Sequence, residues 1–98
     1  MHKKTLRIIG INPGTRYMGI AVFCGPELRD WQVKNMEGRW SKDKITKVIT
    51  ILSSLIDSYE VNVLAIKKLN PSRSSRHLDQ LADRIERLSK MRKMRFGM

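Results

Sequence analysis

Cationic side chains gather in the last third of this sequence, where their spacing suits phosphate binding. Arg73 and Arg76 stand with three serines just before a segment of helical periodicity. A helix N-terminus offers free N–H groups and the positive end of the helix dipole, so this cluster fits a phosphate group. The serines could equally act only as helix caps. Lys67 and Lys68 follow an apolar run, at the expected end of a strand, where solvated lysines are also ordinary.

The end of the chain adds a second group of cations. Between positions 84 and 95, six residues are basic and one is acidic. Part of this run suits a helix C-terminus, because the helix dipole favours cations there. The run is also typical of a nucleic-acid footprint. The sequence therefore predicts a set of nucleic-acid contacts, which comprises Lys67, Lys68, Arg73, Arg76, Arg84, Arg87 and Lys90.

Other residue types that could do chemistry are sparse. Asp79, Asp83 and Glu86 fall on one side of a helical segment and could pass for a metal cluster. The pairs Asp83–Arg87 and Glu86–Lys90 lie four residues apart, however, and salt bridges explain the acids without a metal. The two histidines have no partner at ligand or catalytic spacing. We therefore predict no metal site and no cofactor.

The elements that carry these residues follow the order β-β-β-α-β-α. Turn signals with proline and glycine separate the first three apolar runs, and a stripe of apolar residues then marks a helix. The first and fourth strands are nearly continuous apolar runs, as expected of strands buried on both faces. The order predicts an α/β fold with a mixed sheet and helices packed on it. The expected elements are strands 5–11, 17–24 and 28–33, a helix that begins after the N-cap Ser41, strand 61–66 and a helix over 76–93.

Two features of these elements bear on packing and assembly. The apolar positions of the helix over 76–93 are spaced 3, 4 and 3 residues apart, which favours packing on the sheet over a helix–helix seam. Trp31 and Trp40 could stack on bases, but single aromatics in a small domain more often pack. The chain ends where a further strand would begin, so strand 61–66 is expected to be an unpaired edge. That edge and the helix over 76–93 are the two predicted routes to a homodimer.

Composition limits the class of protein. The chain has 98 residues, a net charge of +11, 41% hydrophobic residues and 30% charged residues. These values predict one globular domain over residues 1–98 with a polyanionic partner, of which nucleic acid is the first choice. No apolar run approaches the ~18 residues of a membrane span, so no membrane association is expected. Cys24 is the one cysteine, which excludes an internal disulfide and favours a reducing, cytoplasmic location.

The segment over residues 8–23, Ile-Ile-Gly-Ile-Asn-Pro-Gly-Thr-Arg-Tyr-Met-Gly-Ile-Ala-Val-Phe, resembles the opening of the RuvC-like Holliday-junction resolvases. That family opens with a strand, an Asp-Pro-Gly turn and a second strand. It belongs to the RNase H-like fold, whose element order matches the one predicted above. The resemblance covers nearly all of this chain, although the family fold is longer by a strand and a helix. It favours DNA as the nucleic-acid partner, and the sequence itself leaves RNA open.

The resemblance also implies a metal site, and here the sequence departs from the family. Family nucleases hold two divalent ions with an aspartate after the first strand, a glutamate that ends the fourth and aspartates on a later helix. This sequence has Asn12 and Lys67 at the first two positions, and the chain ends before the later helix. An ammonium ~4 Å from a divalent ion is repelled by roughly 8 kcal/mol at a dielectric of about 20. The same ammonium suits a phosphate directly.

The sequence therefore predicts a nucleic-acid-binding RuvC-like domain without a competent two-metal centre. One alternative is an active, magnesium-dependent structure-specific endonuclease completed by a partner chain or by residues beyond position 98. A second alternative is a protein-interaction or dimerisation module whose charge is incidental. A third is a degenerate product without activity.

Overall fold

Two tight reversals fold the first three strands into an antiparallel meander. The computed structural model describes residues 6–14, 16–36, 38–67 and 76–97. β1 pairs with β2 from Arg7–Cys24 to Asn12–Gly19, and β2 pairs with β3 along its whole length. The predicted order is confirmed, with a short fifth strand at the end. The elements are β1 (Arg7–Asn12), β2 (Tyr17–Cys24), β3 (Glu27–Asn35), α1 (Lys42–Tyr59), β4 (Val63–Ile66), α2 (Arg76–Met91) and β5 (Arg95–Gly97).

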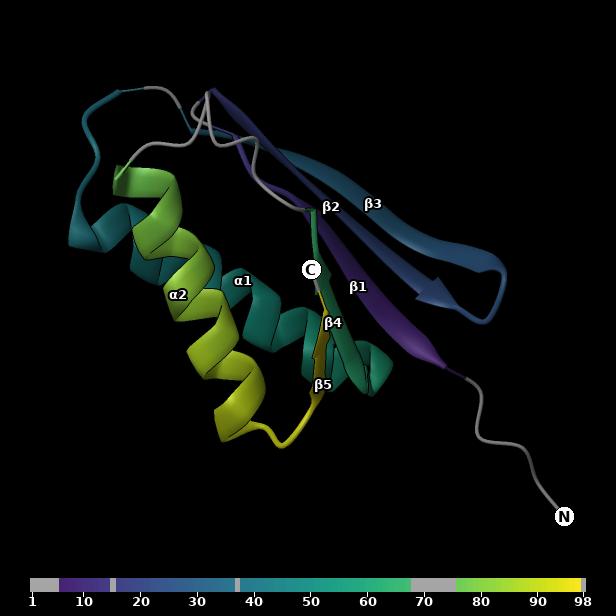
Figure 1. Ribbon diagram of the computed structural model, residues 1–98. Helices are drawn as coiled ribbons and strands as arrows, with labels where there is room; N and C mark the ends of the chain where they lie inside the picture. Colours follow the sequence, from purple (N-terminus) through teal and green to yellow (C-terminus); the bar gives the residue numbers. More distant parts are fainter. Residues whose placement is uncertain (1–5, 15, 37, 68–75, 98) are drawn as a thin grey trace, which may run out of the picture.

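The remaining strands join the sheet in parallel through helical crossovers. β4 pairs in parallel with β1 after α1, and β5 pairs in parallel with β4 after α2, which gives the strand order β3-β2-β1-β4-β5. Parallel neighbours require such long connections because the chain must return to the same end of the sheet. Figure 1 shows both helices on one side of the sheet. The opposite face carries no helix in the described part of the chain.

Helix α1 begins and ends at well-defined caps. Ser41 is extended, with φ −149° and ψ 163°, and its hydroxyl oxygen accepts a hydrogen bond from the Lys44 N–H at 3.2 Å. This confirms the predicted N-cap. At the other end Glu60 adopts a left-handed conformation, with φ 51°, and its N–H donates to the carbonyl oxygen of Ile56. No helix in the described ranges is long and apolar enough to cross a membrane.

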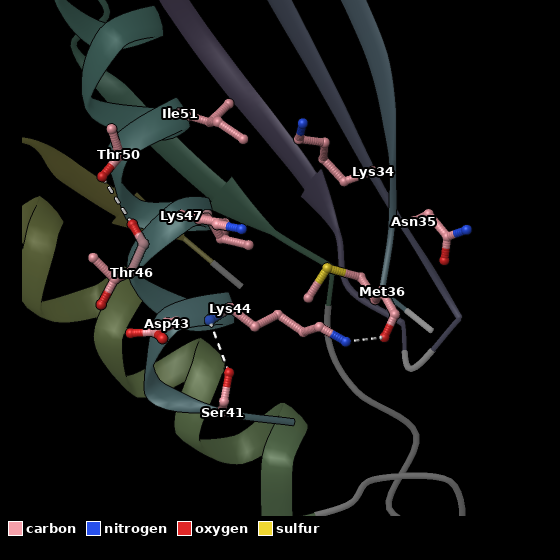
Figure 2. Close-up of a pocket in the computed structure, with 11 residues that line it drawn as sticks. Lys34, Asn35, Met36, Ser41, Asp43, Lys44, Thr46, Lys47, Thr50 and Ile51 are labelled. Atoms are coloured by element: carbon pink, nitrogen blue, oxygen red, sulfur yellow. Dashed lines mark hydrogen bonds between the residues drawn. The ribbon is translucent and has the colours of Figure 1, made fainter. Parts of the chain in front are cut away.

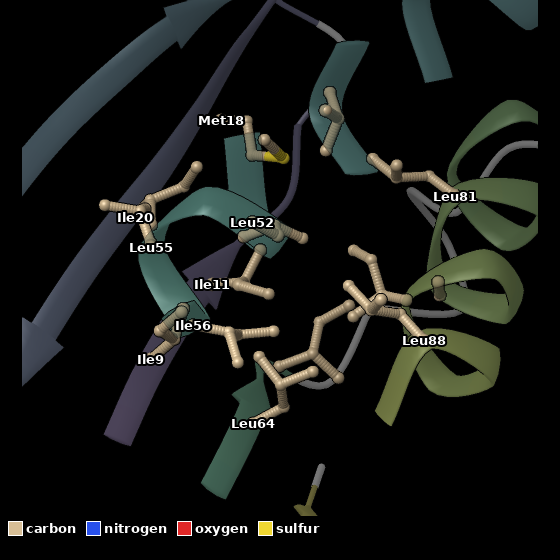
Figure 3. Packing of buried hydrophobic residues seen from close by; sticks show 14 of the residues in the cluster. Ile9, Ile11, Met18, Ile20, Leu52, Leu55, Ile56, Leu64, Leu81 and Leu88 are labelled. Carbon is tan, nitrogen blue, oxygen red and sulfur yellow. The ribbon is translucent and has the colours of Figure 1, made fainter. Parts of the chain in front are cut away.

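The core fills the space between the sheet and the two helices. Alternate residues of β1, β2 and β4 point toward the helices, as the two-residue period of a strand requires. The apolar positions of α2 are buried against them, which confirms packing on the sheet over a helix–helix seam (Figure 3). The fully buried side chains include Ile9, Met18, Ile20, Val22, Leu52, Leu64, Leu81 and Ile85.

Two expectations about β1 and β4 are wrong. Neither strand is covered on both faces, because every second residue of β4 is only half-buried and the face away from the helices is open. Nor is β4 a sheet edge, since Leu64 pairs with Phe96 of β5. The last residues of the described chain form a strand, which the sequence predicted only beyond position 98. β4 is paired on both sides, so it offers no free edge to a second copy. The apolar stripe of α2 is buried, so it offers no exposed apolar face for helix pairing.

Candidate nucleic-acid interface

The ends of β1 and β4 bring Asn12 and Lys67 together. Ile11 lies opposite Ile66 in the parallel pairing, so the next residue of each strand, Asn12 and Lys67, comes to the same end of the sheet. The Lys67 N–H donates to the Ile11 carbonyl oxygen at 2.8 Å, which extends the ladder to this point. Both side chains are exposed. Two residues that lie far apart in the sequence thus form one site.

This site belongs to a hollow of about 460 Å³ on the open face of the sheet. Strand register explains why the surface is concave there. Trp31 lies opposite Ala21, Ala21 lies opposite Gly10, and Gly10 lies opposite Ala65. Paired residues point to the same face of a sheet. A row of small residues therefore runs from Trp31 toward Lys67 and forms the floor of the hollow.

The side chains at the hollow suit an anion better than a cation. Asn12 offers one neutral amide oxygen and Lys67 a positive charge, and no carboxylate lines the hollow among the described residues. In the same ranges no group of three histidine, cysteine or acidic residues is placed to hold a metal ion. Divalent ions such as magnesium require hard, preferably anionic oxygen ligands. The donors present here do not fit the two-metal centre that the resemblance implies.

The other predicted contacts that the structure describes all lie on α2. Lys68 and Arg73 lie outside the described residues. Arg76 is exposed at the first position of α2, at the end of the sheet where β4 ends (Figure 1). The helix must begin there because it carries the chain back to the start of the parallel strand β5.

Three further predicted contacts lie along α2, away from the hollow. Arg84, Arg87 and Lys90 are exposed, but none of them lines the hollow, and α2 is on the opposite side of the sheet. The Arg87 Nε lies 3.2 Å from the Asp83 Oδ2, which confirms one predicted salt bridge. The ion pairs of the described residues do not include the other predicted bridge, between Glu86 and Lys90. The predicted set is therefore not one continuous patch.

A second, larger hollow was not predicted from the sequence. It measures about 650 Å³ and lies between the end of β3 and the first half of α1 (Figure 2). Three lysines line it, Lys34 from β3 and Lys44 and Lys47 from α1, together with Asp43. The Lys44 ammonium donates to the Met36 carbonyl oxygen at 2.9 Å. This hollow is a second cationic surface, on the helix-covered side of the sheet.

The two tryptophans have different environments. Trp40 is half-buried, and its ring stacks on His77 with centroids 5.2 Å apart and planes 7° from parallel. The prediction that the tryptophans pack within the domain is therefore confirmed for Trp40. Trp31 is 67% exposed on the open face, so the expectation that it packs within the domain is wrong. The strand register explains this exposure, because the residue paired with Trp31 is the small Ala21 and the next residue across the sheet is Gly10.

Shifted pKa values mark structural contacts away from the hollow. The Arg92 guanidinium donates to Asp57 at 2.6 Å and lowers the pKa of that carboxyl group. Burial raises the pKa of Tyr59, and the nearby carboxylate of Asp30 raises it further. The Tyr59 hydroxyl donates to the Asp30 Oδ2 at 3.3 Å. These contacts tie α1 to β3 and to the end of α2, and they offer no catalytic group to the hollow.

Comparisons with known proteins identify the fold. No family model matches the sequence, and no curated protein matches it. Among solved structures, the chain is similar to RuvC of T. thermophilus in complex with a Holliday junction substrate, with a TM-score of 0.79 and 11% identity over 95% of this chain. The chain spans 64% of that RuvC chain.

Two other solved structures share the architecture more distantly. YeaZ from Pseudomonas aeruginosa matches with a TM-score of 0.65 and 8% identity over 95% of this chain and 43% of its own. A Bacteroides thetaiotaomicron protein with an actin-like ATPase fold matches with a TM-score of 0.61 and 13% identity over 97% of this chain and 33% of its own. The mixed sheet with two helices is thus close to the RNase H-like fold of RuvC, as the sequence predicted.

Proposed function

We propose that this chain is an RNase H-like domain that binds nucleic acid, with DNA as the preferred form, and does not cleave it. The observation that carries the proposal is the position of Lys67. Lys67 lies at the end of β4 next to the end of β1, and it lines a hollow that no carboxylate lines within the described ranges. A cation at that point attracts a phosphate and repels a catalytic metal ion.

The overall charge supports the same partner. With a net charge of +11, the domain attracts any polyanion over long distances, and the exposed cations of α2 add to this field. Arg76 stands at the same end of the sheet as the hollow, so a backbone that passes over Lys67 can continue toward the start of α2. Arg84, Arg87 and Lys90 then contribute non-specific attraction to other parts of a large ligand.

The choice of DNA follows from the likeness to RuvC. The T. thermophilus RuvC structure contains a Holliday junction, so a four-way junction is the first ligand to test. Duplex and single-stranded DNA of matched length are the comparisons. The cytoplasmic location expected from the lone cysteine is compatible with this role and is part of the proposal.

Fluorescence anisotropy of labelled junction, duplex and single strand against the purified chain tests the proposal. We expect affinity to fall steeply with salt, with a log–log slope of about −4 to −5 for roughly five neutralised phosphates. A slope near zero, or no binding at low salt, would contradict it. A stable oligomer indifferent to nucleic acid would instead favour the interaction-module alternative.

A further inference from the structure

The exposure of Trp31 is not explained by the packing of the domain. Its side chain stands on the open face of β3, 67% exposed, whereas Trp40 is half-buried against the core. Tyr17 and Val33 are exposed on the same face, at 55% and 47%. Tryptophan is the largest apolar side chain, and leaving it in water forfeits the free energy that burial would provide.

The residues beside Trp31 leave one flank of the indole ring free. Its direct partner is Ala21, followed across the sheet by Gly10 and Ala65. A Cβ atom at Gly10 would lie 4.0 Å from the nearest heavy atom, and one at Gly19 would lie 3.7 Å away, both ordinary contacts. Neither glycine has a positive φ. The backbone and the packing would therefore tolerate a larger side chain, and what the glycines provide is open space.

The charge around this space identifies the kind of ligand. Among the described residues that line the hollow, the charged one is Lys67, at the side opposite Trp31. Two strand spacings of about 4.8 Å separate Trp31 from Gly10, and a third leads to β4. Lys67 carries its ammonium on a flexible four-carbon stem that can reach back over the hollow. An aromatic plane on one side and a mobile cation on the other match the base and the phosphate of one nucleotide.

We propose that Trp31 is a stacking platform for an unpaired base, with Lys67 contacting the adjacent phosphate. The inference rests on the proposed nucleic-acid-binding function and specifies its ligand. A base within a duplex is already stacked on its neighbours and presents only its edge, so a free base face requires a single strand or an unpaired position. The hollow therefore selects unpaired nucleotides, such as those at a strand end or a branch point.

Substitutions at Trp31 test the stacking contact directly. The probe is an oligothymidylate of about 12 nucleotides, within the ~4–16-nucleotide range of single-strand sites. We expect Trp31→Ala to weaken its binding about tenfold, because aromatic stacking contributes on that order. Trp31→Phe keeps an aromatic plane and should retain most of the affinity. Val33→Ala, on the same strand and face, is the matched control and should leave binding unchanged.

A matched ligand separates stacking from charge. An abasic oligomer of equal length and charge lacks the bases that stack. The wild type should bind it about as weakly as Trp31→Ala binds oligothymidylate. Trp31→Ala should bind the abasic oligomer and oligothymidylate with the same affinity. In a Trp40→Phe background, the fluorescence of Trp31 should fall with oligothymidylate and not with the abasic chain. If the Trp40→Phe variant does not fold, the anisotropy measurements on proteins that keep Trp40 still test the stacking contact.

Each outcome has a distinct meaning. Equal affinity of wild type and Trp31→Ala for oligothymidylate, with normal salt dependence, would overturn the stacking inference and leave the proposed function standing. Absence of binding to any oligonucleotide would overturn both. A wild-type dimer in sedimentation that Trp31→Ala converts to a monomer would show that a second copy covers this face, and would overturn the stacking inference as well.

Discussion

Reversal of the charge at Lys67 should weaken DNA binding more than the same change elsewhere. Lys67 is exposed, so its interaction with a phosphate ~4 Å away takes place in a water-like dielectric and amounts to about 1 kcal/mol. Replacement by glutamate removes that attraction and adds a repulsion of similar size. The expected total of about 2 kcal/mol corresponds to roughly 30-fold weaker binding at low salt.

The salt dependence of binding provides a second readout. Loss of one phosphate contact should make the log–log slope shallower by about 0.9, and Lys67→Gln should show this change with a smaller loss of affinity. The assay is anisotropy of labelled four-way junction DNA over a salt series, with circular dichroism to verify folding. Because Lys67 is at a strand end and exposed, the variants are expected to fold.

Lys47→Glu is the matched control, because it changes the net charge by the same amount. Lys47 is exposed on α1, on the helix-covered side of the sheet, and it lines the second hollow and not the one that Lys67 lines. We expect Lys47→Glu to weaken binding only a few-fold through the general field of the protein. If Lys47→Glu and Lys67→Glu weaken binding equally, net charge accounts for the affinity and the position of Lys67 does not.

Four further predictions concern the metal site and the fold. The double variant Asn12→Asp/Lys67→Glu should bind Mn²⁺ detectably in calorimetric titration, because it places two carboxylates side by side; a wild type that binds equally well would refute the reasoning. Leu81→Ala should lower the free energy of unfolding by ~2–5 kcal/mol, because Leu81 is fully buried, whereas Leu28→Ala at a half-exposed site should change it by less than ~0.5 kcal/mol in urea titration. Glu60→Gly should be more stable than Glu60→Ala by ~1 kcal/mol, since both lose the ion pair with Arg7 and only glycine adopts the left-handed φ of 51° without strain; equal stabilities would show that the cap is not strained. Arg92 lowers the pKa of Asp57 in the folded state, so this ion pair stabilises the fold above the ordinary pKa of 3.8 and loses its effect as the pH falls through the lowered value; Asp57→Asn should therefore reduce the urea midpoint at neutral pH, and a difference that persists unchanged in acid would contradict the linkage.

Most of the fold could be predicted because its signals are local. The turn residues after β1 and β2 define the meander, and the apolar stripe after Ser41 defines α1 together with its N-cap. A helical crossover between β1 and β4 favours their parallel pairing, and the resemblance to the resolvase family placed Asn12 and Lys67 at positions of one site.

The parts that could not be predicted depend on long-range packing. A continuous apolar run does not reveal whether one face or two are covered, so β1 and β4 were expected to be buried on both. A three-residue strand such as β5 carries too little pattern to be recognised. The exposure of Trp31 depends on which residues lie opposite it on β2 and β1, and register is a property of the assembled sheet. The separation of Lys67 from Arg84, Arg87 and Lys90 likewise depends on the side of the sheet that α2 covers.

Binding and cleavage measured together, with and without a divalent metal, test the central claim most directly. Labelled four-way junction is titrated with the purified chain in magnesium or in EDTA, and each sample is then run on a denaturing gel. The account predicts salt-dependent binding that does not need the metal, with every strand intact. Magnesium-dependent cleavage that Asn12→Ala abolishes would contradict it, because it would show that the hollow holds a working metal centre.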